Sequence, residues 1–185
     1  ASLKARMDPT ASILRSLNAR ARAAQSRMLF AEGDDNRVLR AAVSYHRNGY
    51  GHAVVVGRDA DVEDRLKAEG LGDAFGEIEV INAAKTEHLD TYKAYIYERL
   101  NRKGFDVAEV HRLVARDRHV FAAAMLAHGH GDALVTGATR KSAHVLSLIN
   151  HVFDARAEDG VVGVTAVLHR GRIILIADTL VHEWP

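Results

Sequence analysis

Short apolar runs that alternate with helical patterns constrain the fold of this 185-residue chain more than any other feature. A run that is apolar throughout is buried on both faces, as in a parallel sheet covered by helices on both sides. We therefore expect an α/β fold, a three-layer α/β/α parallel sheet. The expected strands are 28–31, 52–56, 78–81 and 133–135, and the residues with helical spacing lie within 38–43, 61–69, 88–102, 106–115 and 118–127.

The pattern changes after Asp159-Gly160, where two β-rich runs follow each other closely. Residues 161–168 and 172–176 flank a tight Arg170-Gly171 turn, which predicts an antiparallel hairpin. At the other end of the chain, Pro9 opens an amphipathic helical pattern.

Composition excludes several classes of protein. No run approaches the ~20 apolar residues that a membrane span needs, so we expect no membrane partner. The chain contains no cysteine, which excludes disulfides and thiolate zinc sites and is typical of a cytoplasmic protein. Six basic side chains and one acid fall within residues 1–27, and the remainder carries a net charge of −4. Nucleic-acid binding by the body is therefore not expected. A basic leader could also be a transit peptide, but a linker helix fits better.

The best candidate site is the loop that follows the fourth expected strand. Such loops lie at the edge where open α/β sheets bind ligands. Glycine permits close approach of the backbone, and helix-start amides, hydroxyls and cations suit a phosphoryl group. The alternative is a plain strand–helix turn with a solvated basic pair. The loop consists of Thr136, Gly137, Ala138, Thr139, Arg140, Lys141 and Ser142.

Two other groups of polar residues are weaker candidates. Residues 32–35 carry three acids that could bind a metal, but Asp34 or Asp35 is better placed to cap the next helix. The pair His128 and His130 lacks the convergent third and fourth ligands that zinc requires. The chain also lacks a dinucleotide fingerprint, because Gly129-His130-Gly131 precedes a strand. We therefore expect neither a metal nor a resident cofactor in this chain.

Three segments resemble the phosphotransacetylase (phosphate acetyl/butyryltransferase) family. Residues 30–42 resemble its opening strand, turn and helix, and residues 131–139 resemble its Asp-Ala-Leu-Val-Thr-Gly-Ala strand and loop. Residues 176–179, followed by Pro185, resemble the segment after the family's hairpin. The basic leader, 8–27, together with Thr179, resembles the phosphotransacetylase-like C-terminal part of bacterial NADP-dependent malic enzymes.

The resemblance implies a two-domain fold like that of isocitrate dehydrogenases, with a ligand cleft between the domains. It implies a basic linker helix over 1–27, a first α/β domain over 28–140, and a truncated beginning of a second α/β domain, with the hairpin, over 141–185. It also places Asp178 near the cleft. His182 stands where the family has asparagine, and the family's Ser-Gly-Arg segment is not present. No catalytic residue is therefore carried over.

Three functions remain open. The first is a regulatory module of an NADP-dependent malic enzyme that binds acetyl-CoA or acetyl phosphate. The upstream malic-enzyme domain of the same polypeptide would then use NADP and a divalent metal to convert malate to pyruvate and CO2. The second is a fragment of an active phosphate acetyltransferase, and the third is a purely structural module for homo-oligomer assembly. We expect the isolated chain to be inactive and to self-associate.

Overall fold

The computed structural model describes residues 9–154, 161–169 and 171–177. The chain divides into two compact units, which are considered separately. One unit spans Gln25–Asp154, and the other combines residues of 1–24 with residues of 155–185. The domain boundary expected at residue 140 stays a prediction.

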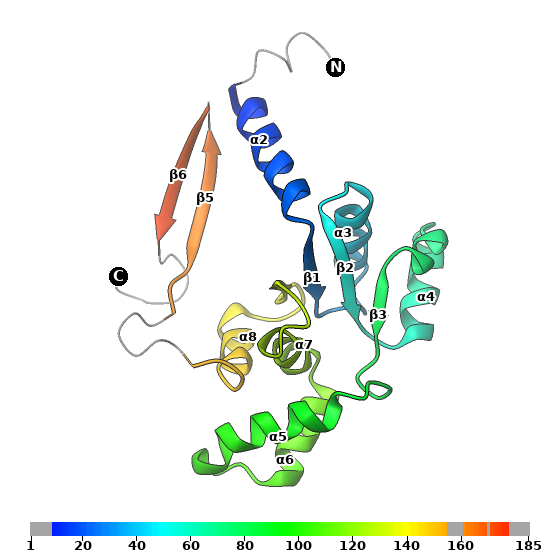
Figure 1. Cartoon of the computed structure of the whole chain (residues 1–185), viewed down its shortest axis with the longest axis vertical. Helices are drawn as coiled ribbons and strands as arrows, with labels where there is room; N and C mark the ends of the chain where they lie inside the picture. The colour runs from blue at the N-terminus through cyan, green and yellow to red at the C-terminus, as the bar shows by residue number, and fades with distance from the viewer. Residues whose placement is uncertain (1–8, 155–160, 170, 178–185) are drawn as a thin grey trace. The chain divides into compact units, whose positions relative to one another are not determined.

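The larger unit is built on a four-stranded parallel sheet, which confirms the predicted fold class (Figure 1). The strands lie in the order β3-β2-β1-β4, so β1 pairs with β2 on one side and with β4 on the other. Met28 of β1, for example, is the partner of both Ala53 and Ala133. The strands are β1 (Ser26–Phe30), β2 (Gly51–Val56), β3 (Glu79–Ile81) and β4 (Ala133–Val135).

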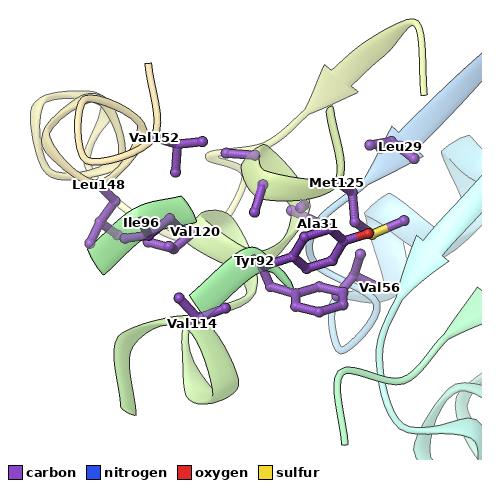
Figure 2. Packing of buried hydrophobic residues seen from close by; sticks show 14 of the residues in the cluster. Leu29, Ala31, Val56, Tyr92, Ile96, Val114, Val120, Met125, Leu148 and Val152 are labelled. Carbon is purple, nitrogen blue, oxygen red and sulfur yellow. The ribbon is translucent and has the colours of Figure 1, made fainter. Parts of the chain in front are cut away.

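Helices cover both faces of this sheet because alternate strand side chains are apolar on both sides. Phe30 and Val55 pack in one cluster with α3 and α4, whereas Leu29 and Val54 pack in another with α5, α6, α7 and α8. Figure 2 shows part of this second cluster, including Leu29. The helices are α3 (Asn36–Arg47), α4 (Asp59–Ala68), α5 (Leu89–Leu100), α6 (Val107–Arg116), α7 (Arg118–Ala127) and α8 (Ser142–Ile149), with 3-10 turns η1 (Gly72–Gly76) and η2 (Asn101–Lys103).

Aspartate side chains set two helix starts that matter for the site. Asp35 caps α3 by accepting hydrogen bonds from the amides of Arg37 and Val38, as the sequence predicts. The Arg37 guanidinium lowers the pKa of Asp35 to about 2. Asp117 caps α7 in the same way, and it is also the C-cap residue of α6. The chain therefore turns sharply between α6 and α7 at this aspartate.

The smaller unit contains α2 (Pro9–Ala24) and a two-stranded antiparallel sheet of β5 (Val164–His169) and β6 (Arg172–Ala177). The predicted hairpin is thus confirmed. Its apolar side chains are exposed, for example Leu175 at 69%. Among the helices described, none is both long and apolar enough to cross a membrane.

Candidate ligand site at the carboxyl ends of the strands

The loops after β1 and β4 meet at the carboxyl edge of the sheet. The chain leaves β1 toward β2 and β3, then returns to β4 on the opposite side of β1. The strand order therefore reverses between β1 and β4, and open α/β sheets bind ligands at such a switch point. Glu32 lies just beyond β1, and Thr136 follows β4 directly.

Glu32 ties the two loops together. Its side chain is fully buried, and its carboxylate accepts hydrogen bonds from the amides of Ala138 and Thr139 at 2.7 and 2.9 Å. The Thr139 hydroxyl donates a third hydrogen bond at 2.5 Å. We refer to this set of contacts as the Glu32 latch. It fixes the start of the loop that the sequence analysis selected.

The latch keeps the Glu32 carboxylate ionised at neutral pH. Burial raises its pKa, but the hydrogen bonds from Thr139 and Ala138 outweigh burial and hold the pKa below its ordinary value. The amides of Ala138 and Thr139 are consequently already bound to an internal anion. They are therefore not available to a phosphoryl group, whereas the helix-start amides named in the sequence prediction belong to α8, which begins at Ser142.

His119 lies beside the Glu32 latch. This α7 side chain is fully buried, and its Nδ1 is 2.5 Å from the Thr136 hydroxyl oxygen. In the part of the chain that the structure describes, its Nε2 has no hydrogen-bond partner. Burial lowers the pKa of His119, although Asp117 and Glu32 oppose the shift, so the ring is neutral at neutral pH.

The remaining predicted loop residues face solvent. Gly137 has a φ of +91°, a conformation that favours glycine. Arg140, Lys141 and Ser142 are exposed at the start of α8, and Lys141 makes no side-chain cap hydrogen bond. The loop therefore separates into a latched first half and an exposed basic second half. Asp178, the last predicted site residue, lies outside the described residues.

A cavity of about 360 Å³ opens on the same edge, beside the Glu32 latch. It is bordered by the ends of β2 and β3, by the turn after β1 and by the corner between α6 and α7. The sequence does not indicate this cavity, because its walls come from segments far apart in the chain. The polar lining includes Asp34, Arg58, Asn82, Arg116 and Arg118.

The histidines weighed as metal ligands do not converge on a metal. His130 lies within hydrogen-bond distance of the Tyr92 hydroxyl, 2.5 Å from its oxygen, and His128 packs against the rings of Tyr92 and Tyr95. Within the described ranges, no group of three or more histidine, aspartate or glutamate side chains could hold a metal ion.

The chain is similar to two kinds of known protein, phosphate acetyltransferases and malic enzymes. The profile of the Phosphate acetyl/butaryl transferase family matches residues 12–185. The chain is 37% identical to an NADP-dependent malic enzyme from Rhizobium meliloti over 99% of its own length and 24% of the relative. It is 31% identical to a phosphate acetyltransferase from Thermoanaerobacterium thermosaccharolyticum, over 73% of its own length and 40% of the relative.

A solved structure shares the fold. The EutD phosphotransacetylase from Staphylococcus aureus superposes with a TM-score of 0.80 at 20% identity, covering 94% of this chain and 52% of that chain. The chain thus spans about a quarter of the length of the malic enzymes that it matches and half of the length of this phosphotransacetylase.

Proposed function

Because the chain belongs to the Phosphate acetyl/butaryl transferase family, we propose that it is the acyl-CoA- and phosphate-binding regulatory module of an NADP-dependent malic enzyme. Similarity to malic enzymes over 99% of the chain supports this assignment. Acetyl-CoA or acetyl phosphate is the proposed ligand, and the module would form the C-terminal part of the polypeptide and help it to form homo-oligomers.

The observation that carries the proposal is the position of the exposed basic half of the loop. Arg140 and Lys141 lie at the start of α8, next to the switch point of the sheet. The first amides of a helix have no partner within the helix, and its dipole favours an anion there. The Glu32 latch holds this segment in place without using either cation.

Binding at this segment would regulate the linked enzyme through preferential affinity for one of its states. The upstream domain would carry NADP, the divalent metal and the conversion of malate to pyruvate and CO2. The loop would belong to the effector site only. Asp178 is also proposed to lie near the bound effector.

A second function is favoured by the 31% identity to a phosphate acetyltransferase. In that case the chain would be part of an enzyme that moves an acetyl group between coenzyme A and phosphate. Formation of acetyl phosphate from acetyl-CoA and phosphate by the complete polypeptide, lost in the Arg140→Ala, Lys141→Ala double variant, would favour this second function over the regulatory one.

The regulatory proposal predicts a specific loss of effector affinity. Arg140→Ala combined with Lys141→Ala should weaken acetyl-CoA binding to this chain, because charge-assisted hydrogen bonds are removed. The expected cost is about 1.5–3 kcal/mol per contact, or roughly ten- to a hundredfold in affinity. Calorimetric titration of this chain, and acetyl-CoA inhibition of malate oxidation by the complete polypeptide, measure the effect. The uninhibited oxidation rate should stay the same.

A matched control is available in η2. Arg102 and Lys103 form another exposed basic pair, so Arg102→Ala with Lys103→Ala removes the same charge away from the loop. This control should bind acetyl-CoA like the unmodified chain. If the Arg140/Lys141 variant also binds like the unmodified chain, the loop is only a solvated turn and the proposal is wrong.

A further inference from the structure

We propose that the cavity between the strand ends and the α6–α7 corner is a second binding site, which takes a small phosphate ester with an apolar or aromatic body. It is lined by Arg58, Arg116 and Arg118 and does not include the loop 136–142. The inference goes beyond the proposed function, because it concerns a different site and holds whether or not the loop binds acetyl-CoA.

The charges around the cavity leave one cation without a partner. Arg118 pairs with Asp34, and Arg58 pairs with Asp61 at 2.7 Å. Asp117, the third acid of the lining, accepts the amide hydrogens of the first turn of α7. Each acid is therefore engaged. Arg116 is exposed, and its guanidinium makes no ion pair or hydrogen bond with any residue that the structure describes.

The geometry of the arginines suits a terminal phosphate. A guanidinium offers five N–H donors, and even a bidentate pair with a carboxylate, such as Asp61 for Arg58 or Asp34 for Arg118, engages only two of them. Both side chains therefore keep donors for a ligand. Three guanidiniums, one after β2 and two at the α6–α7 corner, match the three terminal oxygens of a phosphate ester better than the two oxygens of a carboxylate.

The rest of the lining suits the carbon skeleton of such a ligand. Val56, Ala83, Ala84, Ala115 and Phe121 contribute to the walls. A volume of about 360 Å³ lies within the range of small-molecule sites, which combine apolar walls with a few polar groups.

The surroundings of Arg118 add to the attraction for an anion. Burial lowers the pKa of Arg118, the Glu32 carboxylate opposes the shift, and Arg140 lowers the pKa further. The negative charge of a bound phosphate would stabilise the charged form of Arg118 against both burial and the repulsion from Arg140.

Calorimetric titration of the intact chain with adenosine 5′-monophosphate tests the inference, with adenosine and succinate titrated in parallel. We expect adenosine 5′-monophosphate to bind, and adenosine and succinate to bind at least about tenfold more weakly. Arg116→Ala should weaken adenosine 5′-monophosphate binding by about tenfold or more. Asp34→Asn should tighten it severalfold, because Arg118 loses its internal partner.

The controls separate this site from the loop. Arg112→Ala removes an exposed arginine one turn earlier on α6, outside the cavity, and should leave binding unchanged. The Arg140→Ala, Lys141→Ala variant should bind acetyl-CoA more weakly at the loop but retain adenosine 5′-monophosphate. The inference fails if the unmodified chain does not bind adenosine 5′-monophosphate, if Arg116→Ala binds it normally, or if succinate binds equally well. None of these results bears on acetyl-CoA binding at the loop.

Discussion

Replacing Glu32 with alanine should lower the free energy of unfolding by about 3–5 kcal/mol. The substitution removes a buried acceptor of three hydrogen bonds and leaves the amides of Ala138 and Thr139 without that partner. A hydrogen bond to a charged group contributes about 1.5–3 kcal/mol, and relief of the buried charge offsets part of the loss. Urea denaturation followed by circular dichroism measures the change.

Two variants locate the source of this effect. Glu32→Gln keeps the volume and one acceptor oxygen, so it should destabilise less than Glu32→Ala. Glu98→Ala, on the exposed side of α5, removes a carboxylate with no hydrogen bond or ion pair to any residue the structure describes, and should change stability by under about 0.5 kcal/mol. If Glu32→Ala and Glu98→Ala are equally stable, the Glu32 latch does not stabilise the folded chain and the prediction is wrong.

The same carboxylate should make stability depend on pH. Its pKa in the folded chain is below the ordinary value of 4.5, so the folded state favours the ionised form. The contribution is therefore complete above the unfolded pKa and is lost as the pH falls through the lower folded pKa. The stability difference between the unmodified chain and Glu32→Gln should be constant near neutrality and should shrink under acidic conditions. A difference that stays constant down to pH values below the folded pKa would argue against this origin.

Gly33→Ala should destabilise the protein by about 2–3 kcal/mol through overpacking. A Cβ atom at this position would lie 2.6 Å from Val55 Cγ1 and 2.7 Å from the Val56 carbonyl oxygen. Val55 is fully buried, and the Gly33 amide donates a hydrogen bond to the Val56 carbonyl, so neither neighbour moves easily. Any displacement also shifts the adjacent Glu32 and weakens the Glu32 latch.

Gly76→Ala is the matched control for this substitution. A Cβ there would meet no atom within 4 Å, and the residue does not have a positive φ. Its stability in urea should equal or slightly exceed that of the unmodified chain, since alanine restricts the unfolded state more than glycine does. If Gly33→Ala is as stable as Gly76→Ala, the turn after β1 is less tightly packed than the structure indicates.

The sequence predicts much of the framework because burial leaves a local signature. Runs such as 53–56 are apolar at every position, and only a strand covered on both faces makes such a run favourable. The Asp35 cap is equally local, since its hydrogen-bond partners are two and three residues away. The loop 136–142 was selected by the same reasoning, from its place after an apolar strand and before a helix.

The hydrogen bonds of the Glu32 latch join residues that are far apart in the sequence. Glu32 and Ala138 are 106 residues apart, and they meet only because β4 pairs with β1 and not with β3. Apolar strands give no information about which neighbours they pair with, since each is buried on both faces. The local sequence therefore does not show that the amides of Ala138 and Thr139 bind an internal carboxylate.

The cavity could not be predicted from the sequence for the same reason. Arg58 follows β2, whereas Arg116 ends α6 and Arg118 begins α7, and each alone is typical of a solvated surface arginine. The sequence by itself determined the layers and the place of the loop at the edge of the sheet, because hydrophobic periodicity acts within each element. Only the tertiary structure decided which charges are buried, paired or left facing a cavity, because those states depend on the order in which the strands and helices assemble.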